Sequence, residues 1–276
     1  MKTSYEILTE ALEKYRPIKV ALLFSGGHDS LVNTHVCANI LTGLQIAFVV
    51  YHGDTTIGIP ETQEYVKDVC KKYNWNLIIR RPPNKKDWYD ELIKGYGFPG
   101  PTKQSHQICY RRLKERALNA FVTHECKTSP YKREFVLLCS GVRKDESKIR
   151  MGYVHETSKD RSKIWTNPVF YFTEKDCERY MKEYDLPRNP VKDRICISGE
   201  CLCGAFGGKE EFAEIKTCYP ETAARINALH EMAIANGHPW HWSSGPTEWR
   251  RQNNLRQTNM FMCVGCESKK EYKESA

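Results

Sequence analysis

The feature that most constrains the fold is the stretch KVALLFSGGHDSLV at residues 19–32, where an apolar run meets a glycine turn and then a helical pattern. Residues 20–24 carry no polar break, which predicts a buried strand. Gly26 and Gly27 allow a tight turn and a close approach to the backbone. A strand, a glycine turn and a helix together present free backbone N–H groups to a phosphate, so we expect an anion site here.

The first half of the chain repeats this alternation. Strands are predicted at residues 18–24, 45–51, 76–80 and 135–140, and helices at about 30–42, 60–73 and 109–122. Such an order is typical of an α/β fold, in which a parallel sheet is covered by helices on both faces. Ligands of these sheets bind at the carboxyl ends of the strands, so the loop after each strand is expected to contribute to a site.

The texture of the sequence changes near residue 188. A helix is predicted after Thr173, with Thr173 as its N-cap and Asp176 in the capping-box position, and Pro187 ends it. From Arg188 onward Cys, Gly, Trp and basic residues dominate, with one further helix expected at about 220–235. We therefore predict an α/β domain at residues 1–187 and a cysteine-rich, basic and aromatic module at residues 188–276.

Charge and cysteine content narrow the class of protein. The chain of 276 residues has a net charge of +8, which favours polyanionic partners such as nucleotides or nucleic acid, although it also suits simple solubility. No apolar run is long enough to cross a bilayer and the N-terminus shows an amphipathic helix rather than a signal-peptide core, so we expect a cytoplasmic protein with no membrane partner. Twelve cysteines in a reducing compartment favour a metal site over disulfides.

The loop at residues 25–30 has the composition of a phosphate-binding loop. A Gly-Gly pair alone also suits a turn without a ligand, and the loop is neither a Walker A sequence nor a dinucleotide fingerprint. The motif SGGHDS resembles the SGGxDS pyrophosphate loop of the adenine nucleotide α-hydrolase (PP-loop) superfamily, whose members bind ATP or an adenylyl sulfate. The resemblance implies that the nucleotide is bound by Ser25, Gly26, Gly27, His28, Asp29 and Ser30, with His28 where many members carry Lys.

Three later segments resemble the phosphoadenosine phosphosulfate (PAPS) reductase-like branch of that superfamily. They are HGDTTIGIPET at 52–62, CYRRLKERAL at 109–118 and SGVRKDESKIR at 140–150. The resemblance adds the cofactor-binding residues Asp54, Thr55, Arg111, Gly141 and Arg143. It also implies that Asp29, Arg143 and Arg150 act in catalysis, since two arginines at this spacing can grip phosphate or sulfate in bidentate fashion. Asp54 at a strand end can take a ribose hydroxyl or a metal, or it can simply cap a turn.

Clustered cysteines predict a metal centre in the C-terminal module. A C-x-C and a C-x-x-C some sixty residues apart form a four-thiolate set of Cys201, Cys203, Cys263 and Cys266, with Cys196 as the alternative ligand. Such a set suits Zn²⁺ or an iron–sulfur cluster. The segment SGECLCGAF resembles reductase-like proteins with sulfur-transfer relatives that carry [4Fe–4S], which favours the cluster.

The resemblance implies an enzyme that uses ATP and Mg²⁺ to adenylate an acceptor, releasing pyrophosphate so that sulfur from a donor such as a cysteine desulfurase can displace AMP. The Arg250, Arg251 and Arg256 run makes DNA or tRNA a reasonable acceptor. True sulfonucleotide reductases carry a C-terminal Glu-Cys-Gly-Leu-His segment that this chain lacks. The alternatives are a PAPS or adenylyl-sulfate reductase that uses an external thiol, and a non-catalytic nucleotide-binding subunit of a defence complex.

Overall fold

The computed structural model describes residues 1–100, 103–144, 155–205, 207–242 and 244. The chain divides into two compact units, one formed by residues 1–89 with 111–202 and the other by residues 90–110 with 203–276. Residues 188–202 therefore group with the first unit, and the predicted domain boundary at residue 187 stays a prediction.

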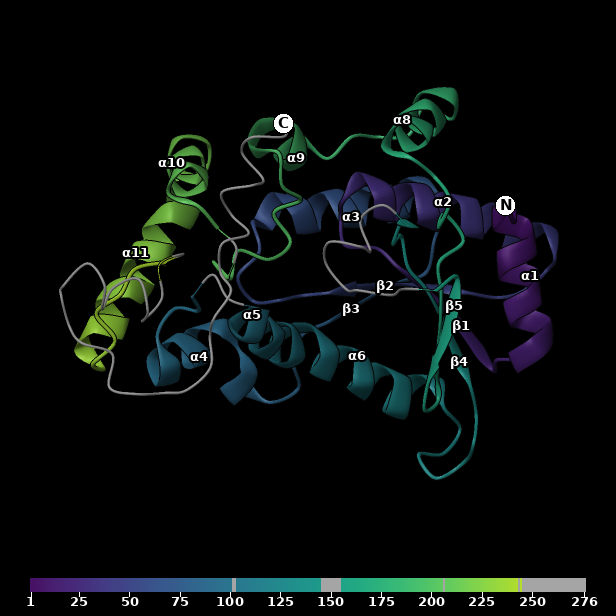
Figure 1. Ribbon diagram of the computed structural model, residues 1–276, viewed down its shortest axis with the longest axis horizontal. Coiled ribbons are helices and arrows are strands. Elements are labelled where there is room, and N and C mark those ends of the chain that lie inside the picture. The colour runs from purple at the N-terminus through teal and green to yellow at the C-terminus, as the bar shows by residue number, and fades with distance from the viewer. Residues whose placement is uncertain (101–102, 145–154, 206, 243, 245–276) are drawn as a thin grey trace. The chain divides into compact units, whose positions relative to one another are not determined.

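The first unit is built on a mostly parallel sheet, which confirms the predicted α/β class (Figure 1). Within the described residues the strands are β1 (Lys19–Leu23), β2 (Val49–Gly53), β3 (Leu77–Arg80), β4 (Val136–Cys139), β5 (Thr157–Asp160) and β6 (Lys163–Thr166). Their order is β3-β2-β1-β4-β6-β5, and β5 alone among them runs antiparallel to its neighbour. The chain leaves β1 toward β3 on one side and returns to β4 on the other. The carboxyl ends of β1 and β4 therefore form the topological switch point, where such sheets bind ligands.

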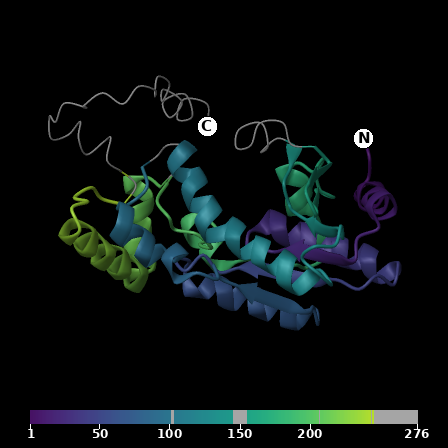
Figure 2. The same ribbon diagram turned by 90° about the horizontal axis from the view of Figure 1, so that it is seen from below.

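Helices cover both faces of this sheet (Figures 1 and 2). The described helices of the unit include α1 (Ser4–Tyr15), α2 (His28–Gly43), α3 (Pro60–Lys72), α6 (Arg116–Phe121), α8 (Glu174–Glu183) and α9 (Pro190–Ile195). On one face, buried residues of α1, α2, α3 and α8 pack with Leu22 and Leu137. On the other, Leu118 and Phe121 of α6 pack with Leu138. Burial on both faces explains why β1 and β4 read as unbroken apolar runs in the sequence.

The sequence predictions for this unit differ from the structure in two places. The four predicted strands are confirmed, with β2 beginning four residues later than expected, and the capping box of Thr173 and Asp176 is present. The strands β5 and β6 were not predicted, because they are short and carry Lys and Asp side chains. The predicted helix at 109–122 is interrupted by a π-helical turn at Tyr110–Glu115 before α6.

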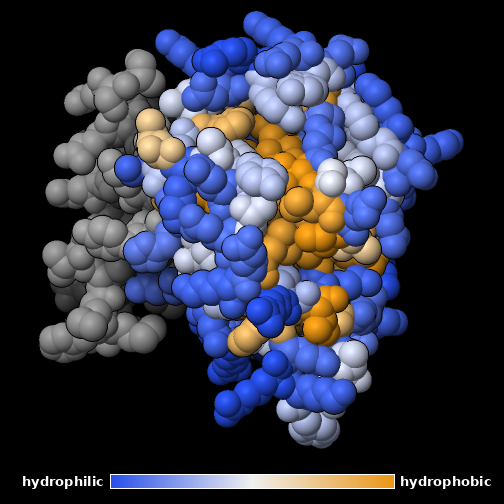
Figure 3. All heavy atoms as spheres, turned by 90° about the vertical axis from the view of Figure 1, so that its right-hand side faces the viewer, coloured by the Kyte–Doolittle hydropathy of each residue, from blue (hydrophilic) through white to orange (hydrophobic). Residues whose placement is uncertain are grey.

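The amino-terminal edge of the sheet leaves apolar side chains accessible. Ile18 and Leu44 are 44% and 36% exposed, and Ile46, Phe48 and Phe135 are only partly buried. Figure 3 shows apolar side chains gathered on the side of the molecule that carries α1. No helix in the described part of the chain is long and apolar enough to cross a membrane.

The described part of the second unit is helical. It contains α4 from Asp90 onward (Tyr89–Tyr96), α5 (Lys103–Cys109), α10 (Lys209–Cys218) and α11 (Pro220–Ala235), and the last of these was predicted at the same residues. Trp242 is buried and packs so closely on Gly204 and Gly207 that a Cβ there would lie within 3 Å of its ring. The Trp240 indole donates to the Phe98 carbonyl. Trp242 thus serves as a core residue of this unit, and the partly buried Trp240 is held against Phe98.

Candidate nucleotide-binding site

The loop after β1 begins the candidate site. Gly26 has φ of +87°, and a Cβ at this position would lie 2.7 Å from Thr62 Cγ2, so glycine is required both by conformation and by space. Gly27 is the extended N-cap of α2 and provides no side-chain cap for the helix. The Ser30 hydroxyl donates to the Gly27 carbonyl at 2.8 Å and lies 3.1 Å from Ser25 Oγ. The loop is therefore shaped in advance, with the N-terminus of α2 open to an anion.

A residue that is distant in the sequence, Asn189, holds this loop in place by hydrogen bonds. Asn189, which is fully buried, donates through Nδ2 to the Gly26 carbonyl at 2.9 Å and to the Ser198 carbonyl at 3.2 Å. The Thr62 hydroxyl donates to the same Ser198 carbonyl at 2.6 Å. Because Asn189 donates to both the Gly26 and the Ser198 carbonyls and Thr62 donates to the latter, hydrogen bonds join the 25–30 loop to the segment just before Cys201.

The loop after β4 meets the start of α2 at the switch point. A Cβ on Gly141 would lie 2.8 Å from the Asp29 carbonyl oxygen, so only glycine lets the two loops come this close. Arg143 is buried and donates through Nη2 to Asp29 Oδ2 at 3.1 Å. This pair neutralises a carboxylate that would otherwise repel phosphate.

The His28 side chain is directed away from the predicted phosphate position. Its ring is 3% exposed and lies 4.0 Å from Glu178 Oε1 and 3.8 Å from Asp193 Oδ1. Burial, with Lys192 and Arg188 nearby, lowers the pKa of His28 below its usual value, so the ring is neutral at pH 7. His28 therefore brings no positive charge to a phosphate, and a contact from its side chain stays a prediction.

The loop after β2 shows the capping alternative for Asp54. Its Oδ1 accepts the Thr56 N–H at 2.8 Å and its Oδ2 accepts from Arg81 at 2.8 Å. A role of Asp54 in binding ribose or metal stays a prediction. Thr55 is buried and its hydroxyl donates to the Glu200 carbonyl at 2.6 Å, so its side chain supports the loop.

The basic segment at 110–116 forms ion pairs with two carboxylates, Asp87 and Glu200. Asp87, which is 1% exposed, accepts from Arg112 at 3.0 Å and also from Arg116. Burial alone would raise the pKa of Asp87, but the two arginines outweigh it and hold that pKa below its usual value. Lys114 pairs with Glu200 at 2.6 Å. Arg111 itself is exposed, and its predicted contact with the nucleotide stays a prediction.

The predicted metal ligands fall only partly within the described residues. Cys196 is exposed, Cys201 is partly exposed and Cys203 is buried. Cys263 and Cys266, like the predicted catalytic residue Arg150, lie outside the described residues. No group of three or more His, Cys, Asp or Glu side chains within the described ranges could hold a metal on its own. In the sequence, Cys196 and Cys201 lie on either side of residues 198–200. The Ser198 carbonyl of this segment shares the Asn189 donor with the Gly26 carbonyl of the candidate loop.

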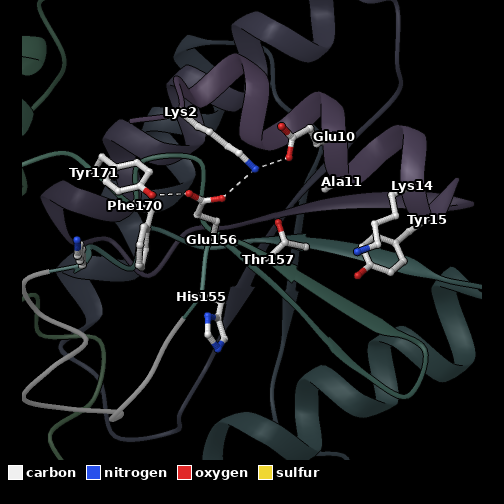
Figure 4. A pocket seen from close by; sticks show the side chains of 11 residues that line it. Lys2, Glu10, Ala11, Lys14, Tyr15, His155, Glu156, Thr157, Phe170 and Tyr171 are labelled. Carbon is white, nitrogen blue, oxygen red and sulfur yellow. Dashed lines mark hydrogen bonds and ion pairs between the residues drawn. The ribbon is translucent and has the colours of Figure 1, made fainter.

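A pocket of about 490 Å³ lies beside α1 and the start of β5 (Figure 4). The Lys2 ammonium lies 2.6 Å from Glu10 and 3.3 Å from Glu156, and Tyr171 donates to Glu156 at 2.5 Å. These groups satisfy one another. None of the residues predicted to bind the nucleotide is among those that line the pocket, so we do not assign the nucleotide to it.

Sequence reasoning missed the groups that support the site. Asn189 donates to the Gly26 carbonyl across 163 positions of the sequence, and the only local signal for Asn189 is the Asn-Pro pair at a helix start. Cys177 is buried, and its thiol lies beside Asp29. Burial, reinforced by that carboxylate, raises the pKa of Cys177 to about 12.

A mostly parallel α/β sheet with a glycine-containing loop at its switch point is an arrangement that several classes of nucleotide-binding protein share, PP-loop proteins among them. The profile of the phosphoadenosine phosphosulfate reductase domain matches residues 19–269, and the chain belongs to this family. The match spans the sheet, the candidate loops and the cysteine motifs.

Individual relatives are distant. An uncharacterised protein of Methanocaldococcus jannaschii is 25% identical over 92% of this chain and 59% of its own length. A phosphoadenosine 5'-phosphosulfate reductase of Alkalilimnicola ehrlichii is 22% identical over 63% of this chain and 65% of its own. The chain thus spans about three fifths of the length of these relatives. A PAPS reductase from Candida auris, solved with phosphate, matches 70% of this chain and 84% of its own with a TM-score of 0.49 and 18% identity.

Proposed function

We propose that the chain is an ATP-binding PAPS reductase-like enzyme that adenylates an acceptor, with nucleic acid as the acceptor class, and releases pyrophosphate so that sulfur can displace AMP. The observation that carries the proposal is the meeting of the Ser25–Ser30 loop with Gly141 and Arg143 at the switch point. Backbone N–H groups at the start of α2 would receive the leaving phosphates. The Arg143 guanidinium would stabilise the charge that develops on them.

The paired Asp29 gives Arg143 its direction. Asp29 Oδ2 accepts from Arg143 Nη2 at 3.1 Å, so the carboxylate can hold the guanidinium in place. Mg²⁺ bound together with ATP would supply charge neutralisation on the phosphates, and its binding to this chain is part of the proposal. Cys201, Cys203, Cys263 and Cys266, with Cys196 as the alternative, would hold a [4Fe–4S] cluster, which supplies sulfur-relay chemistry, or Zn²⁺, which would serve only as a structural clip.

Pyrophosphate release from ATP tests the central step. We expect Arg143→Ala to lower the rate by about a hundredfold or more, because it removes a charge aimed at the reacting phosphates. The matched control is Arg179→Ala on α8, where the side chain is 72% exposed and its one ion pair among the described residues is with Asp176. Equal rates for the two variants would refute the assignment, provided that both keep the wild-type circular dichroism spectrum.

A second candidate is reduction of PAPS or adenylyl sulfate with a thiol supplied by another protein, and the name of the Alkalilimnicola relative favours it. This activity predicts thioredoxin-dependent release of sulfite from the sulfonucleotide and no release of pyrophosphate from ATP. A non-catalytic subunit would bind ATP and release neither product. One assay of sulfite and pyrophosphate therefore separates all three.

The cysteine proposal is tested by anaerobic purification with assays of iron, sulfide and zinc. About four irons and four sulfides per chain are expected, and Cys201→Ser should reduce them. One tightly held zinc would leave the cysteines a structural role. The ten cysteines within the described residues form no disulfide with one another.

A further inference from the structure

The loop after β3 is basic, exposed and close to the candidate nucleotide site. Its sequence, RRPPNKKDW at residues 80–88, follows the strand that borders β2, so it lies at the same carboxyl edge as the phosphate loop. Arg81 reaches Asp54 of the β2 loop at 2.8 Å. Asp87 binds Arg112 at 3.0 Å, which brings the 110–116 segment alongside.

Four carboxylates of this region, Asp54, Asp87, Glu125 and Glu200, are already engaged in ion pairs. The ion pairs are Arg80–Glu125, Arg81–Asp54, Arg112–Asp87, Arg116–Asp87 and Lys114–Glu200. Lys85, Lys86 and Arg111 are exposed, and within the described ranges none of the three has a carboxylate partner. Cations therefore exceed carboxylates here, even when Glu115 is counted.

Trp88 fixes the direction of two of these cations. Its indole donates to the Pro82 carbonyl at 3.0 Å, which holds the ring in place. The Arg81 guanidinium lies 5.1 Å from the ring centroid and the Lys85 ammonium 5.8 Å from it. Contact with an aromatic ring orients a cation without neutralising its charge, so Lys85 keeps its full charge here, while Arg81 shares its charge with Asp54.

We propose that this basic edge, formed by Arg81, Lys85, Lys86, Trp88 and Arg111, binds the phosphate backbone of a nucleic acid strand and guides it to the nucleotide at the switch point. This inference rests on the proposed function, because it names the surface that receives the acceptor. A single small anion would need one converging pocket, whereas these cations are spread along two segments, as a repeating chain of phosphates requires.

The test is fluorescence anisotropy of labelled single-stranded RNA and DNA of about 20 nucleotides, measured without ATP at several salt concentrations. The variant is Lys85→Glu with Lys86→Glu in the full chain. The matched control is Lys67→Glu with Lys71→Glu on α3, where both lysines are exposed and the charge change is the same. We expect the first variant to bind about tenfold or more weakly with a shallower salt dependence, and the control to stay within about twofold of wild type.

Three outcomes would overturn the inference: no binding by the wild type, equal losses in both variants, or equal competition by polyglutamate and by unlabelled nucleic acid. Failure of the proposed function gives a different result. A chain that binds the strands as expected but releases no pyrophosphate from ATP refutes adenylation and leaves the surface assigned.

Discussion

The loops that follow β1 and β3 lie at the same edge of one sheet but are built in opposite ways. The β1 loop is fixed by hydrogen bonds from Ser30 within it and from Asn189 at the other end of the unit. The β3 loop is exposed, and its cations are held by a tryptophan face and single ion pairs.

The difference indicates that the two loops at this edge suit two different tasks, precise placement of hydrogen-bond donors and long-range attraction of a polyanion. A loop held by buried hydrogen bonds places backbone donors within tenths of an ångström, as transition-state stabilisation requires. Exposed cations contribute little to stability, and they act over several ångströms by steering a polyanion. Substitutions in the first loop should therefore affect folding and chemistry together, while those in the second should affect mainly association.

Gly26→Ala should have the largest effect. The positive φ and the 2.7 Å approach to Thr62, which cannot easily move because its hydroxyl holds Ser198, both oppose a Cβ. We expect the free energy of unfolding to fall by about 2–4 kcal/mol in urea denaturation, with loss of ATP binding. Gly43→Ala is the control, since a Cβ there meets nothing within 4 Å, and its effect should stay within about 1 kcal/mol. Similar losses in the two variants would contradict a rigid β1 loop.

Asn189→Ala should come next. It removes both bonds from Nδ2 and the cap that Oδ1 gives to Val191, and it leaves buried carbonyls without their donor. We expect a loss of about 2 kcal/mol in unfolding free energy and weaker ATP binding by calorimetry. Asn236→Ala, at an exposed residue with one bond to Met232, should change stability by less than about 0.5 kcal/mol. Wild-type ATP affinity in Asn189→Ala would show that the loop keeps its shape unaided.

Asp87→Asn tests the base of the β3 loop and should depend on pH. Because the folded pKa lies below the usual value of 3.8, the carboxylate stabilises the fold above that pH and loses this effect as pH falls through the folded pKa. At pH 7 we expect the variant to lose about 1–2 kcal/mol, since the arginine partners are partly exposed. In urea denaturation the gap from wild type should close in acid below about pH 4. A gap independent of pH would rule out the charge as its cause.

Asp54→Asn should have the smallest effect. Asp54 lies in the β2 loop and pairs with Arg81 of the β3 loop. An amide oxygen can still accept the Thr56 N–H, so only the exposed ion pair with Arg81 is lost. We expect less than about 1 kcal/mol in stability and less than about twofold in ATP affinity. An affinity loss of tenfold or more would instead assign Asp54 to ribose or metal.

Much of the fold could be predicted from local signals. The apolar runs of β1 and β4 are buried on both faces, so they stand out without an alignment, and the helix at Pro220–Ala235 was found from a proline at its first turn. The strands β5 and β6 gave no such signal. β5 is an exposed edge strand with the sequence TSKD, and β6 is only four residues long and begins with a lysine.

Only those parts of the candidate site that lie within one contiguous motif could be predicted from the sequence. Ser25–Ser30 and Gly141–Arg143 were identified from two motifs that resemble those of a known family, and the structure brings the two segments together. The direction of His28 toward α8 and α9 could not be predicted, since it depends on Glu178 and Asp193 from distant helices. The pairing of Asp54 with Arg81 likewise depends on strand neighbours rather than on sequence neighbours.

The hydrogen bond from Asn189 to Gly26 also has a consequence for the order in which the chain folds. It joins residues 163 positions apart, so during synthesis the glycine turn leaves the ribosome long before its anchor exists. The helices and the first parallel strands can form around an unanchored turn, which then locks when residues 189–198 return to it. Chains that end before Asn189 should therefore lack an anchored phosphate loop even where their sheet has begun to form.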